Sequence, residues 1–136
     1  TVSMYVDGNG VPTTKDVSKA GTTRDAFTIA ELVMGVNETT EADLPETVLA
    51  WDLVRAVNMA RWAFICGYIN EDEMWEAIRT TAGIAKESFS SWEEYGNSFA
   101  VGRGIWRGET DDYETADEVV GALLNKEDSP WKAIEW

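Results

Sequence analysis

The segment from Val48 to Gly67, which reads VLAWDLVRAVNMARWAFICG, constrains the fold more than any other part of the chain. Drawn as a helix, it carries large apolar side chains in almost every direction. A helix that is hydrophobic on all sides is usually buried among other elements. We therefore expect a mainly α fold, a compact multi-helix domain arranged around this buried central helix.

Four polar side chains interrupt this segment at intervals of three residues, so they form one oblique ridge: Asp52, Arg55, Asn58 and Arg61. The favoured interpretation is a buried polar network paired with Glu93, Glu94 or backbone carbonyls, because buried charges must normally be paired. The functional interpretation is a pocket that binds an anionic small molecule, since guanidinium groups present forked donors to carboxylates and phosphates. The arginines of that pocket would be Arg55, Arg61 and Arg103.

Four other segments show apolar residues at helical spacing. We expect helices over Arg24–Met34, from Asn70, from Ser90 through Trp106, and from Thr115. Capping-box spacing supports several helix starts, and the pairs are Asp43 with Glu46, Asn70 with Glu73, Ser90 with Glu93, and Thr115 with Glu118. Pro45 fits the first turn of the central helix. Glycines in the helix after Ser90 predict close approach to another backbone, with the central helix as the candidate.

The chain is expected to form a single domain, residues 1–136, in which residues 1–20 make a short β-hairpin or an extended arm. Asp7 to Gly10 contain the residues that supply the positive φ angles of a tight hairpin turn. A calcium loop is disfavoured, because Pro12 and Lys15 follow where further oxygen ligands would be needed.

Acidic residues outnumber basic ones by 25 to 11, and the formal net charge is -14. Such a charge repels nucleic acid phosphates and anionic membranes, and it favours a basic protein partner. Two acidic stretches, Glu38–Glu46 and Glu109–Asp117, are expected to be exposed loops that could meet a basic surface. Within the second stretch, Asp111, Asp112 and Tyr113 are candidate contact residues. Trp136, at the end of the sequence, is a further candidate. For Tyr113 and Trp136, burial in the core is the favoured interpretation.

Nothing in the composition favours an enzyme. The chain has no His and a single cysteine, Cys66, which lies in the apolar segment and is expected to be a buried, inert thiol of an intracellular protein. Adjacent carboxylates such as Glu93 with Glu94 are usually solvated. We expect no catalytic residues, no cofactor and no metal site. No signal peptide is visible, and the polar ridge makes a membrane-spanning central helix costly.

Three motifs, AWDLVRAVNMARWAFICGYINEDEMWE, SSWEEYGNSFAVGRGIW and SPWKAIEW, together resemble the bacterial domain of unknown function 1266 family. The resemblance covers about Leu49 to Trp136. It implies a mainly helical, bacterial, cytoplasmic domain, and the family offers no activity to carry over to individual residues. Small domains of this sort are in some cases encoded beside secreted toxins as immunity proteins.

These observations lead to two hypotheses from different classes. The first is a non-enzymatic acidic binding domain, an immunity-type inhibitor that neutralises a basic toxin. The alternative is a small-molecule sensor or orphan enzyme that uses the arginine-lined polar cluster. A third interpretation is a stabilising domain of a larger assembly.

Overall fold

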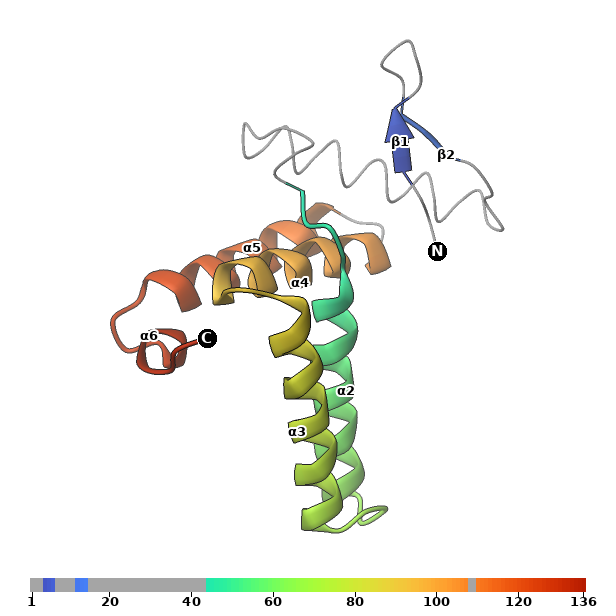
Figure 1. The fold of residues 1–136 in the computed structure, drawn as a ribbon, viewed down its shortest axis with the longest axis vertical. Helices are drawn as coiled ribbons and strands as arrows, with labels where there is room; N and C mark the ends of the chain where they lie inside the picture. Colours follow the sequence, from blue (N-terminus) through green and yellow to red (C-terminus); the bar gives the residue numbers. More distant parts are fainter. Residues whose placement is uncertain (1–3, 7–11, 15–43, 108–109) are drawn as a thin grey trace.

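The computed structural model describes residues 4–6, 12–14, 44–107 and 110–136 (Figure 1). Its elements are β1 (Met4–Val6), β2 (Pro12–Thr14), α2 (Leu49–Ile65), α3 (Glu71–Ser88), α4 (Trp92–Arg107), α5 (Thr110–Asn125) and α6 (Pro130–Ala133). The mainly α fold class is therefore confirmed. At the N-terminus the two strands pair in antiparallel register, with Met4 opposite Thr14. The helix expected over residues 24–34 and the acidic residues up to 43 lie outside the described residues.

The described helices form two arms (Figure 1). Helices α4 and α5 pack side by side in one arm, and α6 packs at the end of α5. In the second arm, α2 and α3 form an antiparallel hairpin that projects from α4. The hairpin turns at Gly67, whose φ of 78° lies in the left-handed region that favours glycine after a helix. No helix in this described part is long and apolar enough to cross a membrane.

The start of α3 has the predicted capping box. The Asn70 side chain accepts a hydrogen bond from the Glu73 backbone N–H at 3.0 Å, and the Glu73 carboxylate accepts one from the Asn70 N–H at 2.8 Å. This arrangement satisfies two backbone donors that a helix start leaves free, while Glu71, Asp72 and Glu73 face the positive end of the helix dipole.

Other predicted helix starts are wrong in detail. Helix α4 begins one residue later than its expected capping box. The Ser91 hydroxyl accepts a hydrogen bond from the Glu94 N–H at 3.1 Å, and the Glu94 carboxylate accepts one from the Ser90 N–H at 2.7 Å. The Ser90 hydroxyl donates a further hydrogen bond to this carboxylate at 2.6 Å, and the hydrogen bonds from the Ser90 hydroxyl and N–H lower the pKa of Glu94. Pro45 precedes α2 rather than lying in its first turn.

The acidic stretch after α4 is helical where a loop was expected. Helix α5 begins at Thr110, so Thr115 and Glu118 lie inside it rather than at its start. Asp111 and Asp112 occupy the first turn, where the helix dipole stabilises negative charge.

The start of α2 is capped both locally, by the Thr47 hydroxyl, which accepts a hydrogen bond from the Leu49 N–H at 3.2 Å, and by a residue of another helix. Val48 provides no side-chain cap. The buried hydroxyl of Ser98 in α4 accepts a hydrogen bond from the Ala50 N–H at 3.2 Å. This bond ties the base of the hairpin to α4 and satisfies a donor that would otherwise be buried and unpaired.

The core lies where the two arms meet. One buried cluster joins α4 and α5 through Ala100, Val101, Tyr113 and Ala116. A second joins α2 to α3 and to the link before α4 through Ala50, Leu53, Ala85 and Phe89.

Only the base of α2 is buried on more than one side. The expectation that this helix is buried all round is wrong, because along the rest of its length α3 covers one face. Cys66, expected to be buried, is exposed.

Two glycines of α4 allow close helix contacts, as the sequence predicted. A Cβ atom on Gly102 would lie 2.6 Å from Trp51 Cβ and 3.2 Å from the Val48 carbonyl oxygen, so α4 touches the central helix here. A Cβ on Gly96 would lie 2.6 Å from Val120 Cγ1 of α5.

Replacing Gly102 by Ala should lower the free energy of unfolding by about 1–3 kcal/mol, because the added methyl group overpacks the crossing of α2 and α4. The matched control is Gly83→Ala in α3, where an added Cβ meets nothing within 4 Å. That variant should gain about 0.5–1 kcal/mol from helix propensity. Urea unfolding of both variants checks this, and equal effects would contradict the close crossing.

Candidate functional site

The polar ridge of α2 faces solvent. Asp52 and Arg55 form an ion pair at 3.6 Å, and both side chains are exposed. Arg61 is exposed and Asn58 is half-buried. Glu93, proposed as a partner, is exposed on α4. Glu94 binds Ser90 instead. The predicted buried network with Glu93 or Glu94 is therefore wrong, because the ridge runs along the side of α2 that α3 does not cover.

Two of the predicted arginines meet at a pair of tryptophans. The Arg55 guanidinium lies 5.7 Å from the Trp51 ring centroid and 5.6 Å from that of Trp106. Arg103 lies 5.5 Å from the Trp51 centroid, and Arg107 lies 5.8 Å from that of Trp106. The two indole rings are themselves 5.6 Å apart. We call these five residues the Arg–Trp cluster, which cation–π attraction stabilises. Arg61 lies outside it.

Asp112 anchors two members of this cluster from α5. Its Oδ1 accepts a hydrogen bond from the Arg103 guanidinium at 2.7 Å, and its Oδ2 accepts one from the Arg107 Nε at 3.2 Å. Burial alone would raise the pKa of Asp112, but hydrogen bonds from Arg107 and Arg103 and their positive charges outweigh burial and hold this pKa below its ordinary value. Asp112 thus pairs within the chain, whereas Asp111 beside it is exposed.

The two aromatic contact candidates pack against the protein. Tyr113 is 1% exposed and belongs to the core between α4 and α5, so it is not an exposed contact residue. Trp136 is half-buried, and its Nε1 donates to the Phe89 carbonyl at 2.8 Å. The C-terminal segment therefore packs back on the body, which agrees with the burial favoured for Trp136, and Trp131 stacks on Trp92 with centroids 4.9 Å apart.

One atom of the Arg–Trp cluster lacks a partner within the part of the chain that the structure describes. The Nε1 of Trp51 is buried and makes no hydrogen bond. A buried donor left unpaired costs about 1–3 kcal/mol. Arg55 and Arg103 both lie over the ring of this same indole.

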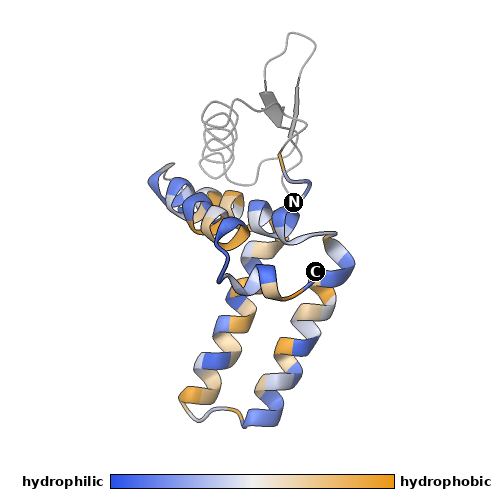
Figure 2. Cartoon of the chain, turned by 90° about the vertical axis from the view of Figure 1, so that its left-hand side faces the viewer, coloured by the Kyte–Doolittle hydropathy of each residue, from blue (hydrophilic) through white to orange (hydrophobic). Residues whose placement is uncertain are grey.

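A second surface, which sequence reasoning missed, lies along α2 toward the turn. Met59, Trp62, Ile65 and Tyr68 are between 62% and 84% exposed, and we call them the hairpin surface. Figure 2 shows the end of α2 beside the turn as strongly hydrophobic. The signal was present in the sequence, because Trp62 falls between Arg55 and Asn58 on the helical wheel and the polar ridge marks the solvent side of the helix.

Acidic residues border the hairpin surface at the turn. Glu71, Asp72 and Glu73 begin α3 directly after it, and all three are exposed. Across the described residues, no group of three His, Cys, Asp or Glu side chains is placed to hold a metal ion.

The described helices thus define a helical-hairpin domain, with one hairpin projecting from a packed pair of helices. Residues 9–136 match the family described as "Protein of unknown function (DUF1266)", and the chain belongs to that family. The resemblance from Leu49 onward is confirmed, and the match also reaches most of the N-terminal part. No curated protein and no solved structure matches the chain.

Replacing Asp112 by Asn should lower the free energy of unfolding at neutral pH, because Arg103 and Arg107 lose their shared carboxylate. A pKa lowered by folding contributes stability above the unfolded value of about 4, and this stability is lost as the pH falls through the folded value. The difference between variant and wild type should therefore shrink in acid. Asp111→Asn is the matched control in the same turn of α5, and urea unfolding from pH 7 to pH 2 measures both. A difference that stays constant with pH would contradict the pairing.

Proposed function

We propose that this protein is a non-enzymatic protein-binding domain that docks through the hairpin surface. One observation carries the proposal: Met59, Trp62, Ile65 and Tyr68 follow one another at intervals of three residues and are all well exposed. Exposed apolar groups of this kind, bordered by polar residues, are typical of protein interaction sites. Trp and Tyr are also the residue types that contribute most to binding when an interface desolvates them.

The charge of the chain supports a basic partner. The net charge of -14 acts at long range, and Glu71, Asp72 and Glu73 place carboxylates beside the apolar side chains. A complementary partner has an apolar groove with a basic rim. Opposite charges would accelerate association and make it sensitive to salt.

The finer proposal is a bacterial, cytoplasmic immunity-type inhibitor whose partner is a basic toxin domain. What supports it is the acidic balance, which suits a protein that covers a basic catalytic surface. If so, the partner should arrest growth when expressed alone and should be harmless when expressed together with this protein.

The two guanidinium groups over Trp51 favour one alternative, a small-molecule sensor or orphan enzyme that holds an anion in the Arg–Trp cluster. Arg55 and Arg103 would clamp the anion with their forked donors. Both arginines already have an acidic partner, but the ion pair of Arg55 with Asp52 at 3.6 Å is longer and more exposed than that of Arg103 with Asp112 at 2.7 Å, so Arg55 is the more available arginine.

Replacing Trp62 by Ser should weaken partner binding about 30-fold or more, because truncation of a central interface tryptophan typically costs at least 2 kcal/mol. The experiment compares affinity capture from the native lysate with wild type and variant at low and high salt, followed by calorimetric titration of the purified partner. Val119→Ser is the matched control, since Val119 is an exposed apolar residue of α5.

Equal capture by the Trp62 and Val119 variants, or retention that salt does not change, would contradict docking of a basic partner through the hairpin surface. The anion alternative makes a different prediction for the same purified proteins. Inorganic phosphate should then bind to wild type and to Trp62→Ser, and it should not bind to Arg55→Ala.

A further inference from the structure

A pocket of about 170 Å³ lies at the inner side of the junction between the hairpin, α4 and the C-terminus. Most of its lining is apolar, and the main contributors are Val57, Ile78, Ala82, Trp92, Tyr95 and Trp136. None of these residues belongs to the hairpin surface. At about 100° per residue, Trp62 points about 140° away from Val57 around α2. The pocket is therefore a separate feature of the molecule.

The aromatic walls of the pocket are held in place by the protein itself. Trp92 Nε1 donates to the Ile134 carbonyl and Trp136 Nε1 donates to the Phe89 carbonyl, both at 2.8 Å. The rings of Trp92 and Trp136 meet edge to face with centroids 4.8 Å apart. Because both indole N–H groups are already paired, the rings present only their apolar surfaces to the pocket. Such a preformed apolar cavity is typical of small-molecule sites.

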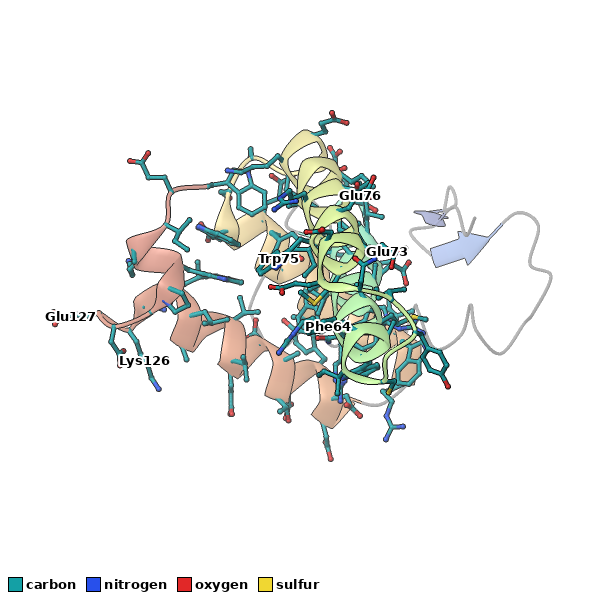
Figure 3. The ribbon with its side chains drawn as sticks, turned by 90° about the horizontal axis from the view of Figure 1, so that it is seen from below. Phe64, Glu73, Trp75, Glu76, Lys126 and Glu127 are labelled. Carbon is teal, nitrogen blue, oxygen red and sulfur yellow. The ribbon has the colours of Figure 1, made fainter. Side chains whose placement is uncertain are left out.

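The pocket opens to solvent on one side, and its volume matches one ring or a short branched chain. A cavity of about 150 Å³ lined by apolar side chains accepts benzene. The pocket is therefore large enough for a single aromatic ring and too small for a nucleotide. Trp75 and Glu73 of α3 lie on opposite sides of the helix (Figure 3).

A single positive charge stands at the rim. Lys86 is the only charged residue among the described ones that line the pocket, and its Nζ lies 5.0 Å from the Trp136 ring centroid. Within the described ranges Lys86 has no ion pair. Burial raises the pKa of Tyr95, so its hydroxyl stays neutral and remains able to donate a hydrogen bond. In a chain of net charge -14, an unpaired cation beside an apolar pocket selects for an anionic head group.

We propose that this pocket binds a small monocarboxylic acid whose body is one aromatic ring or a short branched chain. The body would lie against Trp92, Tyr95 and Trp136, and the carboxylate would reach the ammonium group of Lys86. The proposal is independent of docking through the hairpin surface. An aromatic side chain of a protein partner is the competing occupant.

The test titrates the full chain with phenylacetate, with 2-phenylethanol as the neutral probe and benzylamine as the cationic probe. Tryptophan fluorescence and amide NMR shifts report binding. Phenylacetate should saturate with a dissociation constant on the order of 1 mM or tighter, as its size allows. Each of the other two probes should bind at least about 10-fold more weakly, because neither can accept a charge-assisted hydrogen bond from Lys86 through a carboxylate.

Two variants and a control locate the site. Lys86→Met should weaken phenylacetate binding about 10-fold, while Arg79→Met, which removes an exposed charge from the same helix outside the pocket, should leave it unchanged. Ala82→Phe should fill the pocket and abolish binding. Trp62→Ser should bind phenylacetate like wild type, which separates this result from the outcome for the hairpin surface.

Absence of saturable phenylacetate binding would overturn the proposal, as would equal affinity for benzylamine or unchanged binding by Ala82→Phe. Loss of protein-partner binding in Ala82→Phe, in a chain that does not bind phenylacetate, would assign the pocket to a partner side chain and likewise overturn it.

Discussion

The close crossing of α2 and α4 determines the arrangement of the described helices. Gly102 brings the α4 backbone against Trp51 and Val48, and the Ser98 hydroxyl caps the Ala50 N–H from the same side. Both contacts hold the base of α2 against α4. The hairpin therefore projects from the packed pair of α4 and α5 instead of lying along it (Figure 1).

This projection creates the two surfaces to which we assign binding. On one side, Met59 and Trp62 stay exposed because α3 covers the other face of α2. At the inner side, the angle between the hairpin and α4 leaves a pocket that Trp136 closes from the C-terminus. The Arg–Trp cluster lies at the crossing itself, where Asp112 holds Arg103 and Arg107 in place.

Local features of this fold could be predicted from the sequence, because they depend on neighbouring residues. The Asn70 and Glu73 box, the turn at Gly67 and the return of the C-terminal tryptophans are of this kind. The resemblance to the DUF1266 family was likewise carried by motifs within the chain. The start of α5 was missed because acidic residues suit both an exposed loop and the first turn of a helix.

Burial could not be predicted in the same way, because it depends on how many helices surround a segment. An apolar segment looks nearly the same whether it is enclosed or packed on one face only, and the polar ridge is the single local sign that the Trp62 side of α2 faces solvent. Arg55 and Arg103 were placed in one group from the sequence, and they do lie together. Their contact with Trp51 and the ion pair of Arg103 with Asp112 depend on the crossing of helices that are distant in sequence, so neither could be predicted locally. The pocket combines α2, α3, α4 and the C-terminus, and no local pattern encodes it.

The central claim is that the free end of the hairpin is an uncovered contact surface. Cys66, the single cysteine of the chain, stands at this end and is exposed. The most direct measurement is the rate at which a maleimide reagent modifies Cys66 in the native protein, in urea and in the captured complex. We predict modification of the native protein at a rate close to that of the unfolded chain, and strong protection by the partner. A thiol that reacts only after unfolding, or that a bound partner leaves equally reactive, would contradict the account.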